Sequence, residues 1–390
     1  MRKLLEGSRA VAEAVRLCEP QVIAAYPITP QTHIIEHLAQ FVADAELHAE
    51  FINAESEFGA ISIVQGAVAA GSRAFTASAS QGLLLMTEVL FNIAGMRLPV
   101  VMVCANRAVS APINIFCDHQ DSMSVRDAGW IQLYVETNQE AMDSIVQAYY
   151  IAEHCELPVM LCMDGFLLTH TFEPVELLDQ DTVKSYLPTF TFNRMLSPDQ
   201  PHTLGAGSEP ENYLEYRYAQ HQAMDKSATI VTAAGDKFAA AFGRSYGLLD
   251  CYFSQDVETV FVTLGSAMGV VRDVVDTLRA QGESVGAVRL RCFRPFPAEA
   301  LLAKLEKSCR VIVLEKAFSC GASGIVATEL RAALQLAGVS LLVHGYICGL
   351  GGRDLTCKVV ENIYQQSLAG PIAQRHGFAG INVTSSEGGG

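Results

Sequence analysis

Three polar side chains stand shortly after apolar runs that have the length of buried strands. Thr29 lies between two prolines in "VIAAYPITP" (22–30), Glu57 lies in "NAESEFGA" (53–60), and Arg107 follows "LPVVMVCA" (98–105). A guanidinium at a strand end can bind a carboxylate through two parallel hydrogen bonds. A carboxylate at such a place can hold or move a proton. These residue types are therefore candidates for a ligand site at the strand ends.

Simpler interpretations of the same residues remain open at this point. A glutamate at the start of a helix is commonly only stabilised by the helix dipole, and Glu55 and Glu57 both precede or begin a predicted helix. Arg107 is equally consistent with capping a helix or with an internal ion pair. The segment "FCDHQDSM" (116–123) resembles a metal site in composition, but a polar turn before a helix is the favoured interpretation, and no metal ligands are predicted.

The elements that position these residues alternate between helix and strand from residue 8 to about 172. Continuous apolar strands that alternate with helices are typical of a parallel sheet with helices on both faces. The patterns predict helices over 8–18, 31–43, 58–71, 81–95 and 139–153, and strands over 22–26, 73–79, 99–104, 130–136 and 157–163. Ligands of such sheets bind outside the carboxyl ends of the strands, where Thr29, Glu55 to Glu57, Ser78 to Gln81 and Arg107 all fall.

The 390 residues predict two α/β domains. Residues 1–175 form the first, and its N-terminal stretch, residues 1–19, has the pattern of an amphipathic helix. Residues 176–254 form a connecting segment packed over the domains, because it is too aromatic to be disordered. Residues 255–370 restart the strand–helix pattern as a second, smaller α/β domain, and residues 371–390 are a tail.

Composition excludes several classes of function. The formal net charge is −15, from 42 acidic and 27 basic residues, which argues against a nucleic-acid partner. No apolar run is long enough to cross a membrane, and the N-terminus lacks the apolar core of a signal peptide. The 11 cysteines are scattered without any C-x-x-C pair, which predicts neither a zinc site nor iron–sulfur ligands. We therefore expect a cytoplasmic protein in a reducing compartment.

Three common catalytic signatures are absent from the sequence. It contains no G-x-x-x-x-G-K-[ST] for a phosphate-binding loop and no G-x-S-x-G nucleophile turn. No G-x-G-x-x-G follows the first predicted strand, so a nicotinamide site is not expected.

Taken together, several stretches resemble one protein family. "YPITP", "AESEFGAI", "TASASQGLLLMTEVLF", "NRAVSAPINIFCDHQD" and "DGFLLTHTFEPVE" occur in the first half, and "VTLGSAMG", "FRPFP" and "GLGGRDLT" in the second. In this order they resemble the alpha subunit of 2-oxoacid:ferredoxin oxidoreductases, and the pyruvate enzymes most of all. The resemblance covers roughly residues 5–360. It implies a thiamine-diphosphate-binding domain of the pyrimidine type, followed by a domain similar to the C-terminal domain of transketolase.

The resemblance also implies that the chain works only with partner subunits. Enzymes of this family hold the diphosphate and Mg²⁺ through a Gly-Asp-Gly motif, and the nearest stretch here is Met163-Asp164-Gly165, which lacks the first glycine. A beta subunit would then carry the diphosphate and Mg²⁺ site, and gamma and delta subunits would carry the [4Fe-4S] clusters that pass electrons to ferredoxin.

Residue roles follow from the same resemblance. Glu57 would bond N1′ of the aminopyrimidine, so that the 4′-nitrogen can remove the proton from C2 of the thiazolium ring. Pro27 and Ile28 would contact the cofactor, while Thr29 and Arg107 would bind the substrate carboxylate. The implied reaction converts pyruvate and CoA to acetyl-CoA and CO₂.

Two alternatives remain at this stage. The same chemistry could act on another 2-oxo acid, such as 2-oxoisovalerate or phenylglyoxylate, with Ile113 and Phe116 as candidate walls of the pocket. Thr29 argues against oxalate, since relatives that act on oxalate carry arginine at that position of the loop. A non-catalytic assembly subunit is the other alternative, but it would be expected to have lost at least one of Thr29, Glu57 and Arg107.

Overall fold

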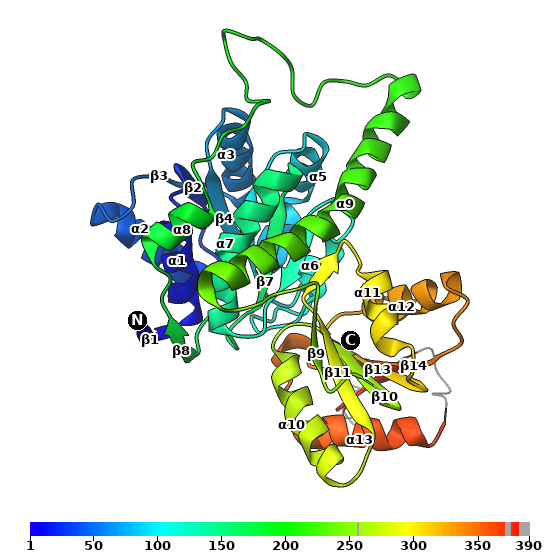
Figure 1. Ribbon diagram of the computed structural model, residues 1–390. Helices are drawn as coiled ribbons and strands as arrows, with labels where there is room; N and C mark the ends of the chain where they lie inside the picture. Colours follow the sequence, from blue (N-terminus) through cyan, green and yellow to red (C-terminus); the bar gives the residue numbers. More distant parts are fainter. Residues whose placement is uncertain (256, 371–375, 382–390) are drawn as a thin grey trace. The chain divides into compact units, whose positions relative to one another are not determined.

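The computed structural model describes residues 1–255, 257–370 and 376–381, and these residues form two compact units. Unit 1 comprises residues 1–249 together with 291–297, and unit 2 comprises residues 250–290 and the chain from 298 onward. Figure 1 shows a sheet covered by helices in each unit, so the predicted α/β fold class is confirmed.

The central sheet of unit 1 has seven strands in the order β12-β6-β7-β5-β4-β2-β3. All neighbouring pairs are parallel except β12 with β6. The strands are β2 (Val22–Ala25), β3 (Glu50–Asn53), β4 (Ala74–Ser78), β5 (Val101–Asn106), β6 (Ile131–Tyr134), β7 (Val159–Asp164) and β12 (Cys292–Arg294). The register pairs Phe75 with Val101 and Val101 with Val159, so the middle strands start level with one another.

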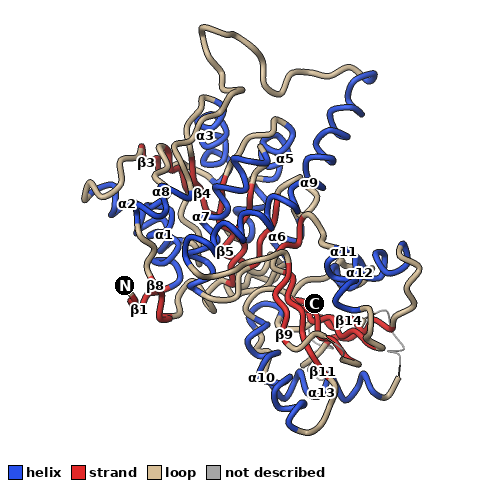
Figure 2. Tube along the Cα trace, in the orientation of Figure 1, coloured by secondary structure: helices blue, strands red, loops and turns tan. Residues whose placement is uncertain are grey.

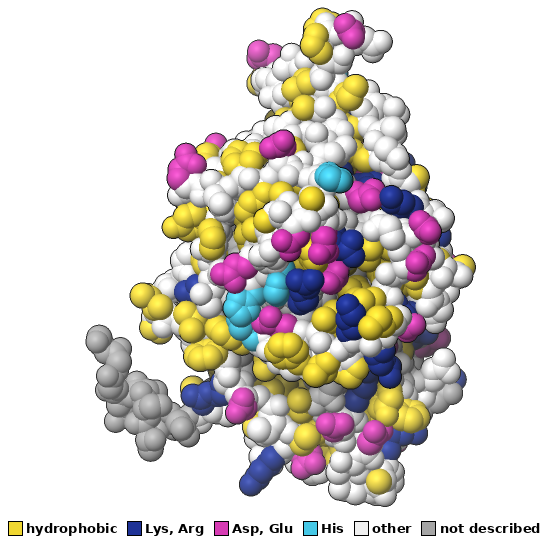
Figure 3. All heavy atoms as spheres, turned by 90° about the vertical axis from the view of Figure 1, so that its left-hand side faces the viewer, with side chains coloured by type: hydrophobic (Ala, Val, Ile, Leu, Met, Phe, Trp, Pro, Cys, Tyr) yellow, Lys and Arg dark blue, Asp and Glu magenta, His cyan; other side chains and the backbone are white. Residues whose placement is uncertain are grey.

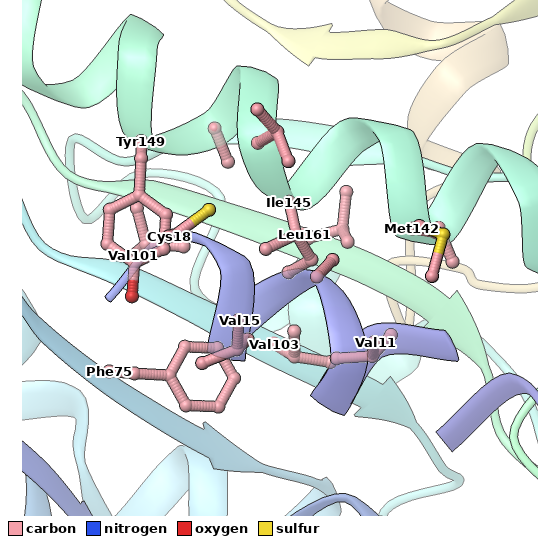
Figure 4. Packing of buried hydrophobic residues seen from close by; sticks show 14 of the residues in the cluster. Val11, Val15, Cys18, Phe75, Val101, Val103, Met142, Ile145, Tyr149 and Leu161 are labelled. Atoms are coloured by element: carbon pink, nitrogen blue, oxygen red, sulfur yellow. The ribbon is translucent and has the colours of Figure 1, made fainter. Parts of the chain in front are cut away.

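Helices cover both faces of this sheet, as alternating strands and helices require. The helices of unit 1 are α1 (Gly7–Leu17), α2 (Thr32–Ala43), α3 (Glu57–Ala69), α4 (Ser80–Leu85), α5 (Thr87–Gly95), α6 (Gln120–Ser124), α7 (Asn138–Cys155), α8 (Gln180–Tyr186) and α9 (Pro210–Phe242). Figure 4 shows α1 and α7 packed on one face, where Val15 and Ile145 meet Phe75, Val101 and Leu161 of the sheet. The helix α3 contacts β2 and β4.

Two predicted elements differ in the structure. The N-terminal amphipathic helix begins only at Gly7, because Arg2–Glu6 form β1, which pairs antiparallel with β8 (Phe172–Glu176). That partner lies about 170 residues away in sequence, so local periodicity could not indicate it. The helix predicted over 81–95 is interrupted at Met86, between α4 and α5.

The long helix α9 belongs to unit 1 and packs against α7. Its first turns and the preceding loop extend away from the sheet of this unit (Figure 2). No helix in the described ranges has the length and apolarity needed to span a membrane.

Unit 2 is built on a six-stranded sheet in the order β15-β14-β13-β10-β11-β9. Its strands are β9 (Leu249–Tyr252), β10 (Thr259–Thr263), β11 (Val285–Leu290), β13 (Arg310–Glu315), β14 (Leu342–Ile347) and β15 (Gly377–Phe378). Its helices are α10 (Ala267–Ala280), α11 (Ala298–Leu305), α12 (Ile325–Leu336), a short 3₁₀ turn (Leu350–Gly352) and α13 (Cys357–Leu368). Of the predicted tail, β15 pairs with β14, whereas residues 371–375 and 382–390 lie outside the described residues.

Candidate active site

The strands β2, β3, β4 and β5 end at one edge of the unit 1 sheet, and the residues singled out in the sequence follow these ends. Thr29 lies four residues after β2, Glu57 four residues after β3, and Arg107 directly after β5. Because the strands are parallel and in register, this edge is where a ligand of an open α/β sheet binds.

Gln31 fixes the loop that carries Thr29. Its buried side chain donates from Nε2 to the backbone oxygens of Tyr26, at 3.0 Å, and Ala77, at 2.9 Å, while its backbone N–H donates to the carbonyl of Ile28 at 2.8 Å. The loop is therefore tied to β4 through one amide group. Within it the predicted residues Pro27 and Thr29 are exposed, and Ile28 is half-buried.

Arg107 brings the Thr29 loop and the segment after β5 together. Its guanidinium donates from Nη1 to the Thr29 carbonyl at 3.0 Å and from Nε to the Asn114 carbonyl at 3.1 Å. Among the described residues Nη2 has no protein partner, so it can bind a ligand. The predicted proximity of Thr29 and Arg107 is thus present, and it is made through the backbone of Thr29.

The segment 108–117 forms the arm that Arg107 holds. Ile113 is 82% exposed and Phe116 is 51% exposed, and the Phe116 ring lies 5.4 Å from the ring of Phe166. The Phe116 carbonyl accepts the backbone N–H of Ala108 at 3.0 Å, which closes the arm into a loop. Both candidate wall residues are therefore on the surface of unit 1 and available to a ligand or partner.

Glu57 is the first residue of α3 and is almost completely buried. Ser56 caps the helix by accepting the Gly59 N–H at 3.1 Å, which fixes the direction in which Glu57 leaves the backbone. Glu55, two residues earlier, is exposed. Of the two glutamates in this segment, only Glu57 is enclosed within the unit.

Gly82 provides the space that Glu57 occupies. A Cβ atom at Gly82 would lie 2.5 Å from Glu57 Oε1 and 2.7 Å from Ser78 Oγ, which no real side chain tolerates. Ser78 Oγ itself is buried without a hydrogen-bond partner among the described residues. A buried hydroxyl without a partner beside a buried carboxylate is costly unless a ligand satisfies it. These groups therefore fit a polar heterocycle such as the aminopyrimidine of thiamine diphosphate.

Asp121 links the two halves of this edge. Its Oδ2 accepts the backbone N–H groups of Ser80 and Arg107, both at 2.9 Å, and its Oδ1 accepts Asn106 Nδ2 at 2.8 Å and the Ser122 N–H at 2.7 Å. Ser80 has a φ of 49°, a left-handed conformation that side chains other than glycine rarely adopt. One buried carboxylate thus holds the start of α4, which carries Gly82, and the start of the arm.

The segment 116–123, interpreted from sequence as a polar turn, contributes a second buried polar pair. His119 Nε2 lies 2.7 Å from Asp164 Oδ1, and both side chains are buried. Cys117 lies within 4.8 Å of the same two groups, a spacing that metal ligands can have. The direct hydrogen bond between His119 and Asp164 accounts for their proximity.

A cavity of about 630 Å³ lies near the opposite edge of the unit 1 sheet, where the strands begin. Gln21, which precedes β2, and Arg73, which precedes β4, contribute to its lining. Thr29, Glu57 and Arg107 do not line it.

Sequence reasoning did not give the supporting residues of the site their roles. Ser78 and Gly82 lie in the quoted stretch "TASASQGLLLMTEVLF", but the sequence does not show that they face Glu57, and Gln31 lies in no quoted stretch. Asp121 was considered only as a possible metal ligand or turn residue. Its function depends on which N–H groups surround it, and this is a property of the folded chain.

Comparisons with known proteins agree with this geometry. The family model for "Pyruvate flavodoxin/ferredoxin oxidoreductase, thiamine diP-bdg" matches residues 13–235, and that for "Pyruvate:ferredoxin oxidoreductase core domain II" matches residues 257–360. The first model confirms the predicted thiamine-diphosphate-binding domain.

Curated relatives are similar over nearly their whole length. The chain is 48% identical to pyruvate synthase subunit PorA of Methanosarcina barkeri over 93% of this chain and 92% of that protein. It is 41% identical to pyruvate synthase subunit PorA of Thermotoga maritima over 97% and 98% of the two chains. It is also 41% identical to ketoisovalerate oxidoreductase subunit VorA of Pyrococcus horikoshii, over 93% of each chain.

A solved structure shares the fold. The 2-oxoglutarate:ferredoxin oxidoreductase of Magnetococcus marinus, solved with 2-oxoglutarate, coenzyme A and succinyl-CoA bound, superimposes with a TM-score of 0.70 at 20% identity. The match covers 94% of this chain and 65% of that one, which is the longer of the two. The two family models and the relatives at 41–48% identity show that the chain belongs to the pyruvate:ferredoxin (2-oxoacid:ferredoxin) oxidoreductase family.

Proposed function

We propose that this chain is the alpha subunit of a thiamine-diphosphate-dependent 2-oxoacid:ferredoxin oxidoreductase that acts on pyruvate. The reaction converts pyruvate and CoA to acetyl-CoA, CO₂ and one proton, and the two electrons released pass through iron–sulfur clusters to ferredoxin. The observation that carries the proposal is the sheet edge of unit 1, where the buried Glu57 faces Gly82 and Arg107 holds the Thr29 loop.

Two residues provide a site for the substrate carboxylate. Arg107 keeps Nη2 available while Nε and Nη1 are fixed on backbone carbonyls, so its guanidinium is oriented before substrate arrives. The exposed Thr29 sits between two prolines on the loop that Gln31 anchors. One guanidinium and one hydroxyl suit a substrate with a single carboxylate. This agrees with the argument that Thr29, in place of arginine, disfavours oxalate as the substrate.

Glu57 is proposed to hold a proton on N1′ of the cofactor pyrimidine, with Pro27 and Ile28 contacting the cofactor from the neighbouring loop. When bound, thiamine diphosphate supplies the stabilised carbanion that decarboxylation of a 2-oxo acid requires. The chain itself supplies a buried carboxylate, the partnerless Ser78 hydroxyl beside it and the space left by Gly82.

Partner subunits are proposed to supply the remaining groups. The sequence has no Gly-Asp-Gly motif, so the diphosphate and Mg²⁺ are assigned to a beta subunit. The scattered cysteines offer no cluster-binding pattern, so the [4Fe-4S] clusters are assigned to gamma and delta subunits, through which ferredoxin is reduced.

One observation supports 2-oxoisovalerate as the alternative substrate. The ketoisovalerate oxidoreductase subunit of Pyrococcus horikoshii is as similar to this chain, at 41% identity, as the pyruvate synthase subunit of Thermotoga maritima. The arm that would distinguish the two substrates, with Ile113 and Phe116, is exposed in this chain and would be completed by a partner.

The test is substrate profiling of the intact complex, purified without oxygen through a tag on this chain. CoA-dependent dye reduction is measured with pyruvate, 2-oxobutyrate, 2-oxoisovalerate, 2-oxoglutarate and phenylglyoxylate. We expect the highest kcat/KM with pyruvate. A preference for 2-oxoisovalerate would change the assigned substrate from pyruvate to that acid. The absence of CoA-dependent activity in a complex that contains cofactor and clusters would refute the proposal.

The role of Glu57 has its own test. Glu57→Gln keeps the shape of the side chain but removes its ability to hold the proton, so we expect an assembled complex with activity lowered by about 100-fold or more. Glu55→Gln, two residues away on the exposed side, is the matched control and is expected to stay active. Equal activity of both variants at saturating cofactor would remove Glu57 from this role.

A further inference from the structure

A group of imidazole and carboxylate side chains lies on the surface of unit 1, apart from Glu57 and Arg107. Glu6 ends β1, His33 is the second residue of α2, and His170 lies in the turn between β7 and β8. We call these three residues the histidine cluster. Figure 3 shows histidine side chains gathered on this face, beside acidic and basic ones.

The ligand atoms of the histidine cluster are close enough to share one ion. His33 Nδ1 lies 2.8 Å from Glu6 Oε1, and the rings of His33 and His170 are 4.5 Å apart between centroids. One ligand atom of each residue lies within 4.8 Å of the others. A tetrahedral Zn²⁺ with bonds of about 2.0–2.1 Å separates its ligand atoms by about 3.3 Å. Because His33 Nδ1 and Glu6 Oε1 lie closer together than this, ion binding requires these side chains to move apart slightly.

His170 already has the second contact that metal-binding imidazoles show. Such a histidine donates its other ring N–H to a nearby oxygen, which fixes the ring and leaves one nitrogen for the metal. Thr169 Oγ1 lies 2.7 Å from His170 Nδ1 and accepts the backbone N–H of Phe166 at 2.8 Å, so the hydroxyl is itself held in place. When Nδ1 donates to this hydroxyl, Nε2 of His170 is left as the ligand atom.

The charges around the histidine cluster permit a cation. His37, one helical turn after His33, places Nε2 3.8 Å from Glu6 Oε2 and Nδ1 3.5 Å from Arg9 Nη1. Arg9 is paired with Glu13 through two contacts, at 2.9 and 3.1 Å, so its charge is largely balanced.

We propose that Glu6, His33 and His170 bind one divalent transition-metal ion, with Zn²⁺ as the best match. Two imidazoles and one carboxylate are ligands that Zn²⁺ accepts, whereas Mg²⁺ and Ca²⁺ take oxygen ligands. Three protein ligands leave a position for water, and all three side chains are partly exposed, so the ion has a path of entry. The ion replaces the hydrogen bond between His33 and Glu6, and His33 binds it through Nδ1 as the neutral tautomer with its proton on Nε2.

Such an ion would join three segments that are far apart in sequence. It would tie β1 and the turn after β7 to the first turn of α2. His33 lies four residues after Thr29, so the ion would brace the helix that follows the substrate loop. The site does not depend on the proposed enzymatic function and can be tested without it.

The experiment titrates the full chain, freed of metal with a chelator, with Co²⁺ and then Zn²⁺ in the presence of excess Mg²⁺. We expect one Co²⁺ per chain with weak visible absorption bands, which Zn²⁺ then displaces. Exposed cysteines such as Cys251 and Cys357 could bind Co²⁺ instead, but thiolate ligands would add intense near-ultraviolet bands. Such bands as the only saturable signal, or no saturable binding up to about 100 µM, would overturn the proposal.

Variants assign the ligands. Glu6→Gln, His33→Ala and His170→Ala are each expected to weaken Zn²⁺ binding by about 10-fold or more. His154→Ala, which removes an exposed histidine from α7, is the matched control and is expected to bind as the unaltered chain does. Equal affinity in all four variants would overturn the assignment.

Thermal unfolding with and without Zn²⁺ distinguishes a variant that has lost a ligand from one that has failed to fold. Zn²⁺ at about 100 times its dissociation constant is expected to raise the thermal midpoint of the unaltered chain by several degrees. The three ligand variants should show their own cooperative transition without metal and lose this rise. A rise retained in all three would place the ion elsewhere.

Discussion

Asp121 shows how a residue can shape this site without contacting a ligand. Its two carboxylate oxygens accept four N–H groups, from Ser80, Arg107, Asn106 and Ser122, and it is completely buried. Ser80 begins the helix that carries Gly82 against Glu57, and Arg107 holds the Thr29 loop. The proposed cofactor side and the proposed substrate side of the edge are therefore positioned by one carboxylate.

The first prediction concerns Asp121→Asn. In Asp121 each carboxylate oxygen accepts two N–H groups. Asparagine replaces one of these oxygens with an NH₂ group, which cannot accept, so in either orientation of the amide two N–H donors lose their acceptor. Hydrogen bonds to a charged group contribute about 1.5–3 kcal/mol each, and we expect the affinity for thiamine diphosphate and the kcat/KM for the 2-oxo acid both to fall by about 10- to 100-fold. Equilibrium cofactor binding and steady-state kinetics of the complex measure the two effects.

The matched control for that prediction is Asp143→Asn. Asp143 is also completely buried and accepts hydrogen bonds from Arg244 and the Tyr246 hydroxyl, but it lies in α7 and bonds neither Ser80 nor Arg107. Its loss should lower the thermal midpoint and leave KM unchanged. If Asp121→Asn behaves in the same way, Asp121 is a stabilising residue only.

The second prediction concerns Arg107→Lys. Lysine keeps the positive charge, but its single ammonium group cannot bond the carbonyls of Thr29 and Asn114 and also offer two parallel donors to a carboxylate. We expect KM for the 2-oxo acid to rise by about 10-fold, with a smaller fall in kcat. Cofactor affinity should stay unchanged, since Arg107 does not contact Glu57 or Gly82. An unchanged KM for every 2-oxo acid tested would contradict the role of Arg107.

At the scale of elements, the sequence predicted the strands of the first sheet well because they are continuous apolar runs bounded by turns. The edge at which Thr29, Glu57 and Arg107 lie followed from the parallel topology. The strand β1 was mistaken for helix, and β12 was not recognised as part of the first sheet, because both are defined by partners distant in sequence. Supporting residues such as Gln31 and Asp121 escaped for the same reason.

In unit 2, the helix α12 begins beside a buried carboxylate. Glu315 ends β13 and accepts the N–H groups of Val326 at 2.7 Å and Ala327 at 3.2 Å, at the start of the helix. Gly324 lies so close that a Cβ there would overlap the carboxylate. Burial nevertheless outweighs these hydrogen bonds and raises the pKa of Glu315 to about 7.

The third prediction follows from this pKa. Since Glu315 binds a proton more tightly in the folded chain than in the unfolded one, its contribution favours folding at low pH. That contribution is lost as the pH rises toward 7, by up to about 3 kcal/mol. Hydrogen exchange of the α12 amides should therefore be faster at pH 8 than at pH 5.5, after correction for the intrinsic rates. In Glu315→Gln, which cannot ionise, this difference should disappear, and its persistence would contradict the assignment.

At the scale of the whole molecule, a short segment from the second half of the chain completes the first unit. Residues 291–297 belong to unit 1, where β12 adds an antiparallel strand beside β6. Arg291 is 1% exposed and donates to Glu140 Oε1 at 3.2 Å, to Ser144 Oγ at 2.9 Å and to Gln147 Oε1 at 3.2 Å, all on α7. The chain therefore cannot be divided at one peptide bond into two self-sufficient parts.

The fourth prediction is that Arg291→Ala destabilises unit 1. Removing the guanidinium breaks the buried ion pair between Arg291 and Glu140, and breaking a buried pair in this way costs about 3–5 kcal/mol. Trp130 is the only tryptophan and is buried in unit 1, so its fluorescence during denaturation of the isolated chain reports that unit alone. Lys358→Ala, at an exposed position of α13, is the control and should leave the Trp130 transition unchanged. If Arg291→Ala unfolds at the same denaturant concentration as the unaltered chain, then the segment 291–297 does not contribute to the stability of unit 1. A fragment ending at residue 249 would in that case be expected to fold by itself.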